Sequence, residues 1–199
     1  MRVNPAYVQW IGDLIIPILG FLFWDWGFYF ILLFILLDVI TKEVFMHMKA
    51  YRMYKLNTAT LSKWLRYSFL NTMLFVSFLI LVHVAVMKMF PSIQFKNEWW
   101  NFWTYEDIGI QQGYVLLPLL AFSGYMQFKQ TFILPNTAAK LTMESLWKPH
   151  IRLNTIRVFA SAVWIALAKV VQVNEVIWMS GLLVSIALFQ WFIQLRKTN

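Results

Sequence analysis

Ionisable side chains occur inside four apolar stretches of the sequence, where they could carry proton or cation chemistry. They are Asp13, Asp38, His83 and Lys169. A charged group inside the hydrocarbon of a membrane costs about 2.5–3.5 kcal/mol on insertion scales, and such groups often mark ion or proton pathways. These four residues are therefore the first candidates for a functional site.

Asp13 and Asp38 are predicted to lie at the same depth in a helical hairpin that turns near Asp25, which is 12 residues after Asp13 and 13 before Asp38. At 1.5 Å per residue, both carboxylates would lie about 18 Å from the turn. Two facing carboxylates do not both ionise readily, so they would hold one proton or share a cation. Asp13, Asp38 and Lys42 form this candidate site. The alternative is structural, because Lys42 is one helical turn from Asp38 and can neutralise it.

A second candidate is a polar cluster in the opposite half of the membrane. Its members would be His83, Gln112, Tyr114 and Lys169. His83 would be its proton carrier, because histidine titrates near neutral pH. The alternative is a lone His83 that makes one hydrogen bond, with Lys169 extending its long side chain to the membrane surface.

The elements that position these residues are predicted to be membrane helices. Of the 199 residues, 60% are hydrophobic and only 13% are charged, and the mean hydropathy is +0.61. One soluble core of this size could not bury that much apolar surface. The pattern predicts an all-α polytopic protein, a single transmembrane domain over 1–199, with six helices in antiparallel hairpins. The predicted helices are about 5–24, 26–46, 67–90, 108–128, 157–173 and 175–195.

The basic residues predict how the helices are oriented. Lys and Arg concentrate in the connection after the second helix, in the connection after the fourth, and at both chain ends, whereas the other connections are mainly acidic. By the positive-inside rule, the six helices place both termini in the cytoplasm. The net charge of +8 therefore predicts topology and contact with anionic lipid, and a nucleic-acid site is not expected.

Two connections are predicted to lie along the membrane surface. The first, 95–107, sets four Trp and Tyr residues beside charges, which is typical of an interfacial aromatic belt. The second, 136–148, reads as a short amphipathic helix that Pro149 ends, and it could instead dock a partner. The tripeptide Leu-Asn-Thr occurs three times, in "KLNTATL", "FLNTMLF" and "RLNTIRV", which is weak support for a duplication.

Motifs for phosphate loops, dinucleotide binding, metalloproteases and serine hydrolases do not occur in the sequence. There are no cysteines, which excludes disulfides and thiolate metal sites. Of the three histidines only His83 falls within a predicted span, so a haem held by two histidines is not expected. No cofactor or metal is expected.

The stretch "GDLIIPILGFLFWDWGFYFILLFILLD", 12–38, resembles the start of a family of bacterial multi-pass membrane proteins of unknown function. In that family a polar residue, a Pro and a Gly mark the first helix, a Trp marks the turn, and an acidic residue lies late in the second helix. The matching positions are Asp13, Pro17, Gly20, Trp26 and Asp38. The resemblance implies a membrane fold and no particular activity.

The sequence favours a non-catalytic subunit or accessory component of a larger assembly in the inner (plasma) membrane. Its expected partners are the lipid bilayer, anionic lipid at the basic face, and another membrane protein or a second copy of the chain. Two alternatives stay open: a small proton- or cation-coupled transporter that uses Asp13 and Asp38, and an immunity protein that blocks a toxin in the membrane. Activity on lipid is a further, weaker alternative.

Overall fold

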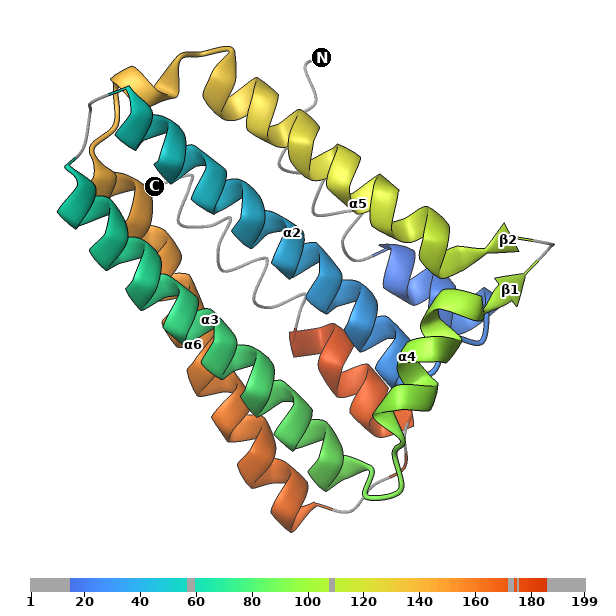
Figure 1. The fold of residues 1–199 in the computed structure, drawn as a ribbon. Coiled ribbons are helices and arrows are strands. Elements are labelled where there is room, and N and C mark those ends of the chain that lie inside the picture. The colour runs from blue at the N-terminus through green and yellow to red at the C-terminus, as the bar shows by residue number, and fades with distance from the viewer. Residues whose placement is uncertain (1–14, 57–59, 108–109, 172–173, 175, 186–199) are drawn as a thin grey trace.

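The computed structural model describes residues 15–56, 60–107, 110–171, 174 and 176–185, and this part of the chain is helical (Figure 1). The helices are 15–23, α2 (Phe28–Lys55), α3 (Leu61–Met89), α4 (Phe95–Thr104), α5 (Gln112–Phe128), α6 (Met143–Val170) and Val176–Ser185. A π-helical turn, η1 (Lys129–Ile133), and a 3-10 turn, η2 (Thr137–Ala139), connect α5 to α6. The described strands, β1 (Glu106–Asp107) and β2 (Ile110–Gln111), pair antiparallel in a small hairpin.

Helix α2 is the centre of the fold. In Figure 1 it lies between α5 on one side and the pair α3 and α6 on the other. Helices α3 and α6 run in the same direction and make the most extensive helix contact of the described chain, while α2 and α5 run the opposite way. Half of the residues of α2 are buried, whereas only three residues of α3 and five of α6 are buried.

Two described helices, α3 and α6, are long and apolar enough to cross a membrane. Six spans are not confirmed. The sequence of α2 interrupts its apolar run with Asp38, Lys42 and Glu43, and α5 has only 17 residues, against about 20 for a full crossing. The two long apolar helices weakly suggest a membrane protein.

A tight turn leads from helix 15–23 into α2. The backbone N–H groups of Trp24 and Trp26 both donate to the carbonyl of Gly20, at 3.2 and 3.0 Å, and Asp25 has a left-handed backbone with φ 50°. The Trp26 ring packs directly on Gly20, where a Cβ atom would overlap it. Trp26 is buried and also contacts Phe30, with 4.5 Å between ring centroids.

The starts of α3 and α6 are fixed by threonine caps. The Thr60 hydroxyl accepts from the Lys63 N–H, and Thr142 and Ser145 form a reciprocal capping box in which each hydroxyl accepts from the other's N–H. Helix α3 consequently begins six residues before the predicted 67–90.

The prediction of a separate helix over 136–148, ended by Pro149, is wrong. Helix α6 runs through Pro149 without a break and joins that segment to the predicted span 157–173. A proline removes one N–H, here the partner of the Ser145 carbonyl. One lost bond does not end a helix when its neighbours and side chains satisfy the freed group. The Ser145 carbonyl lies in the first turn of α6, where the capping box already orders the backbone.

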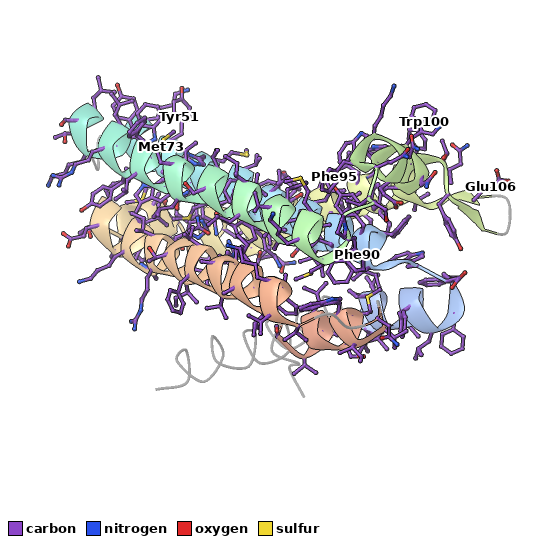
Figure 2. The ribbon with its side chains drawn as sticks, turned by 90° about the horizontal axis from the view of Figure 1, so that it is seen from below. Tyr51, Met73, Phe90, Phe95, Trp100 and Glu106 are labelled. Carbon is purple, nitrogen blue, oxygen red and sulfur yellow. The ribbon has the colours of Figure 1, made fainter. Side chains whose placement is uncertain are left out.

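The two ends of the helix bundle differ in charge and composition. Helix α2 ends, α3 begins, α5 ends and α6 begins at one end, which we call the basic end (Figure 1). Its charged residues are mainly Lys49, Arg52, Lys55, Lys63, Arg66, Lys129, Lys140, Lys148 and Arg152. The opposite end carries α4 and the β-hairpin, with Phe90, Phe95, Trp100 and Glu106 there and Tyr51 and Met73 toward the basic end (Figure 2).

Candidate functional site

Asp38 and Lys42 form an ion pair, with 2.5 Å between Oδ2 and Nζ. The pair follows from their spacing of one helical turn within α2. Asp13 lies outside the described residues, so its pairing with Asp38 stays a prediction. Within the described chain, the structure favours the structural alternative for Asp38, because its charge is already neutralised.

His83 is bound through both ring nitrogens. Nδ1 lies 2.8 Å from the Leu79 carbonyl and Nε2 lies 3.2 Å from the Tyr29 hydroxyl. A carbonyl only accepts, so Nδ1 carries the proton, and in the neutral ring Nε2 accepts from the Tyr29 O–H. Phe95 packs beside the ring, with 5.5 Å between centroids. The arrangement matches the alternative of a satisfied histidine.

The other members of the predicted polar cluster have different surroundings. Tyr114 is exposed and contacts Trp103, with 5.4 Å between ring centroids, and Lys169 is exposed in the last turn of α6. Gln112 begins α5. Among the described side chains, no hydrogen bond joins His83, Tyr114 and Lys169, and the predicted cluster is therefore not formed by these three.

The main polar site of the described chain is one that the sequence patterns did not predict. We call it the Glu43 cluster, and its members are Glu43, Asn71, His150, Asn154 and Arg157. Glu43 comes from α2, Asn71 from α3, and the other three from α6. Glu43 is only 4% exposed and both asparagines are fully buried, so the cluster places a carboxylate inside the bundle where the three helices meet.

Each carboxylate oxygen of Glu43 has its own donors. Oε2 accepts from Asn71 Nδ2 at 2.9 Å. Oε1 accepts from Asn154 Nδ2 at 2.7 Å and is 2.8 Å from His150 Nε2. The Arg157 guanidinium lies 3.7 Å from the same oxygen and supplies a compensating positive charge. Hydrogen bonds and opposite charge are what a buried carboxylate requires.

The two asparagine amides complete the cluster. Asn154 Nδ2 also donates to Asn71 Oδ1 at 2.9 Å, and Asn154 Oδ1 accepts from Arg157 Nη1 at 2.7 Å. Every polar atom of both amides thus has a partner within the cluster. A fully satisfied polar network inside a bundle specifies one packing of its helices, so the cluster fixes α2, α3 and α6 relative to each other.

His47 extends the polar region from the Glu43 cluster toward the outside of α2. Its Nε2 lies 3.4 Å from the Thr72 hydroxyl, and its ring meets the buried Trp147 edge-on at 5.2 Å. His150 contacts the same indole, at 6.1 Å. Two histidines thus flank one buried Trp147 beside Glu43.

Leu-Asn-Thr, the repeated tripeptide, was the available signal for this site. Leu70-Asn71-Thr72 and Leu153-Asn154-Thr155 lie on the parallel helices α3 and α6, and their asparagines are hydrogen bonded to one another. The repeated asparagines therefore meet at one level of the bundle. Asn57 of the third copy lies outside the described residues. The sequence did not indicate that Glu43 belongs to a site, because Glu43 lies near the end of the predicted second helix, where the chain was expected to leave the membrane.

A cavity of about 180 Å³ adjoins the Glu43 cluster, between α2, α5 and α6. We call it the basic cavity. Its polar lining is Lys42, Lys49, Gln127, His150 and Arg157, and apolar side chains such as Phe128 and Leu153 complete the wall. Gly124 also lines it and lets α5 approach α2 closely, because a Cβ there would meet the Phe45 ring at 2.6 Å.

The Glu43 cluster and the basic cavity together hold groups that can exchange protons and bind charged ligands. Glu43 and His150 are a carboxylate and an imidazole in direct contact, and His150 also faces the basic cavity. Among the described residues, no three His, Asp or Glu side chains gather closely enough to hold a metal ion.

Comparisons with family models, with curated proteins and with solved structures find no match for this chain. The resemblance of residues 12–38 to a bacterial membrane family therefore stays a prediction.

Proposed function

We propose that this chain is a six-span inner-membrane protein with both termini in the cytoplasm, and that it acts as a non-catalytic component of a larger membrane assembly. The observation that carries the proposal is the Glu43 cluster. Its buried polar atoms satisfy one another and join three helices, which suits a structural role. The same helices α3 and α6 turn broad apolar faces outward.

Helix lengths and charge support the six-span topology. Helix α5 continues directly into η1, so Gln112 to Ile133 is helical throughout and about 30 Å long. That length matches the hydrocarbon core of a bilayer. The described basic residues gather at the end where α2 meets α3 and α5 meets α6, as the positive-inside rule requires of a cytoplasmic side.

The exposed faces of α3 and α6 support a role within an assembly. Phe69 of α3 is 67% exposed and Phe159 of α6 is 70% exposed. Large apolar side chains at these positions need a covering of lipid or of another membrane helix. In such an assembly, a second copy of the chain or a different membrane protein would pack on these exposed faces of α3 and α6.

Photo-crosslinking tests the assembly directly. A photoreactive side chain would replace Phe69, Phe159 or, as the control, Phe122, which is 65% exposed on α5 across the bundle. We expect one discrete protein adduct from positions 69 and 159 in native membranes, and a complex of fixed stoichiometry after purification in mild detergent. Lipid adducts alone, together with a protein that purifies only as a monomer, would contradict the proposal. A defined homodimer would replace it with self-association.

A second candidate function, proton- or cation-coupled transport, is favoured by the contact between Glu43 and His150 beside the basic cavity. Buried ionisable pairs in membrane helices are common in proton pathways. Flux into liposomes would be compared for the parent, Glu43→Gln and Asp38→Asn. Transport requires a parent flux that Glu43→Gln abolishes. Absence of flux in the parent, or equal flux in the folded Glu43→Gln variant, removes this candidate.

A further inference from the structure

A groove of about 590 Å³ lies between α2 and α3. We call it the α2–α3 groove. Binding sites for small ligands have volumes of about 300–1,000 Å³ and mainly apolar walls. Six of the nine described residues that line this groove are apolar or aromatic: Ile40, Val44, Met48, Tyr51, Trp64 and Phe75. The groove therefore has the size and the lining of a site for an apolar ligand.

The polar residues of the lining already have partners within the protein. Glu43 is buried, and both of its oxygens accept hydrogen bonds from the asparagines of the Glu43 cluster. The other two are His47 and Thr72, and His47 Nε2 lies 3.4 Å from the Thr72 hydroxyl. The groove therefore suits the apolar part of a ligand, and a charged part of the same ligand would lie beyond its end.

The groove is about as long as one leaflet of a bilayer is thick. It extends from Ile40 to Tyr51 on α2 and from Trp64 to Phe75 on α3, a separation of 11 residues in each helix. At 1.5 Å per residue each wall is about 16 Å long. The hydrocarbon of a bilayer is about 30 Å thick, so one leaflet contributes about 15 Å. An extended acyl chain matches this length, whereas a membrane-crossing helix would extend far beyond the groove.

Aromatic side chains form the end of the groove that lies toward the basic end of the bundle, where Figure 2 shows Tyr51. The ring of Tyr51, which is 50% exposed, lies 6.0 Å from that of Trp64. Tyr54 stacks on the same indole, with 5.3 Å between ring centroids. Tyr and Trp concentrate where the hydrocarbon of a membrane meets the lipid headgroups. This end of the groove therefore suits the level of the headgroups.

Basic residues follow directly beyond the aromatic end. Lys55 comes one helical turn after Tyr51, and Arg52 comes one turn after Met48, so both lie on the groove side of α2. Lys63 lies in the first turn of α3, next to Trp64. All three basic residues are exposed, and the ion pairs of the described chain involve none of them. Clustered Lys and Arg at the cytoplasmic surface attract anionic lipids.

We propose that the α2–α3 groove binds one acyl chain of an anionic phospholipid, with the headgroup beside Arg52, Lys55 and Lys63. The apolar walls match the chain, and the exposed cations match the charge of the headgroup. The lipid belongs to the cytoplasmic leaflet. This inference rests on the membrane topology proposed above and is independent of the assembly role. Cysteine labelling tests that topology on its own, so a failure of the topology and a failure of the lipid site are distinguishable.

Photo-crosslinking with a lipid probe tests the site. The full-length protein is placed in phosphatidylcholine liposomes that contain a small fraction of phosphatidylglycerol with a diazirine in its acyl chain. A parallel sample contains phosphatidylcholine with the same photoreactive chain. After illumination, peptide mass spectrometry locates and quantifies the lipid adducts, and thermal unfolding shows whether each variant is folded.

Two pairs of variants separate the groove from the rest of the surface. Val44→Phe narrows the groove, and Val115→Phe makes the same change on α5, outside it; the two valines are 52% and 50% exposed. Lys55→Gln removes a charge beyond the end of the groove. Lys88→Gln removes the same charge from the last turn of α3, at the opposite end of the bundle.

We expect the phosphatidylglycerol adducts to concentrate in 40–51 and 64–75. Val44→Phe should lower their yield about tenfold, as when two methylene groups lose contact with the groove, and Val115→Phe should leave it unchanged. Lys55→Gln should lower the yield about fivefold, the effect of one basic residue at an anionic surface, and Lys88→Gln by less than about twofold, because charge effects decay over a short distance.

Three results of the lipid experiment would overturn the proposal: adducts spread evenly over α2, α3 and α5, equal adducts from the two lipid probes, or equal yields from folded Val44→Phe and Val115→Phe. A photoreactive side chain at position 44 provides the last check in native membranes. A lipid adduct there supports the proposal, and a single protein adduct without lipid would assign the groove to a partner protein instead.

Discussion

Asn71 of α3 and Asn154 of α6 are hydrogen bonded to each other, with 2.9 Å between Asn154 Nδ2 and Asn71 Oδ1, and both donate to the Glu43 carboxylate. Each is the central residue of a Leu-Asn-Thr tripeptide. One buried carboxylate is thus held by two equivalent amides from parallel helices. This arrangement makes the interface of α3 and α6 dependent on a residue of a third helix.

Replacing either asparagine with alanine should destabilise the protein strongly. Asn71→Ala or Asn154→Ala leaves a Glu43 oxygen short of a donor in the protein interior, which costs about 1–3 kcal/mol or more for a charged group. Since the two amides share a bond, the double variant should lose less than the sum of the single losses. Thermal unfolding in detergent measures both effects.

Thr155→Ala is the control for the asparagine variants. It alters the residue after Asn154, whose exposed hydroxyl donates to the Ile151 carbonyl and, among the described residues, to no other group. A loss of stability as large as that of Asn154→Ala would show that this part of α6 is generally sensitive and would contradict a special role for the amides.

Removing the charge of Glu43 should be more harmful than removing that of Asp38. Glu43→Gln leaves the partly buried Arg157 without its compensating carboxylate, and breaking a buried pair from one side costs about 3–5 kcal/mol. Asp38→Asn affects a partly exposed pair and should cost about 1 kcal/mol or less. Adding Arg157→Gln to Glu43→Gln should recover part of the lost stability. No recovery in chemical unfolding experiments would mean that Arg157 does not compensate Glu43.

Gly20 should be intolerant of any side chain. In Gly20→Ala the new methyl group would overlap the Trp26 ring, and the resulting displacement should cost about 1–3 kcal/mol. Gly181→Ala is a matched control, because its methyl group would lie 3.2 Å from the Trp164 ring, which needs only a small adjustment. Unfolding temperature and tryptophan fluorescence of the two variants would be compared. Equal behaviour of both would contradict close packing of Trp26 on Gly20.

Cysteine labelling should place positions 106 and 140 on opposite sides of the membrane. The chain has no cysteine, so Glu106→Cys and Lys140→Cys, both exposed, give clean single sites. An impermeant maleimide should label position 106 in intact cells and position 140 only after permeabilisation. If only α3 and α6 crossed the membrane, both positions would lie on one side and would label alike.

Short-range features of the fold could be read from the sequence. Apolar runs predicted helices that overlap 15–23, α2, α3, α5, α6 and Val176–Ser185 but not α4, and the spacing of Asp38 and Lys42 predicted their ion pair. These features depend on neighbours within about one helical turn. The local sequence pattern is therefore sufficient to predict helices and ion pairs of this kind.

The Glu43 cluster could not be predicted in this way. The donors to Glu43 come from Asn71, His150 and Asn154, which are 28, 107 and 111 residues away in the sequence. These donors reach Glu43 only because α3 and α6 pack against α2. The local sequence does not determine which helices become neighbours. The repeated Leu-Asn-Thr pointed to both asparagines without identifying the carboxylate between them.

Pro149 shows a different limit of sequence reasoning. A proline usually marks a helix boundary, because it lacks an N–H and crowds the preceding turn. In α6 the residue lies six positions after the first helical residue, and the helix continues past it to Val170. Packing of the helix on α3 outweighs the local preference.

The spread of the Glu43 donors along the chain also sets the order of assembly. When α2 and α3 have been synthesised, Glu43 has only Asn71 as a partner, and the three remaining groups arrive with α6, more than a hundred residues later. Until then the Glu43 carboxylate lacks most of the donors and the positive charge that a buried carboxylate requires. The Glu43 cluster is therefore complete only when α6 has packed against α2 and α3.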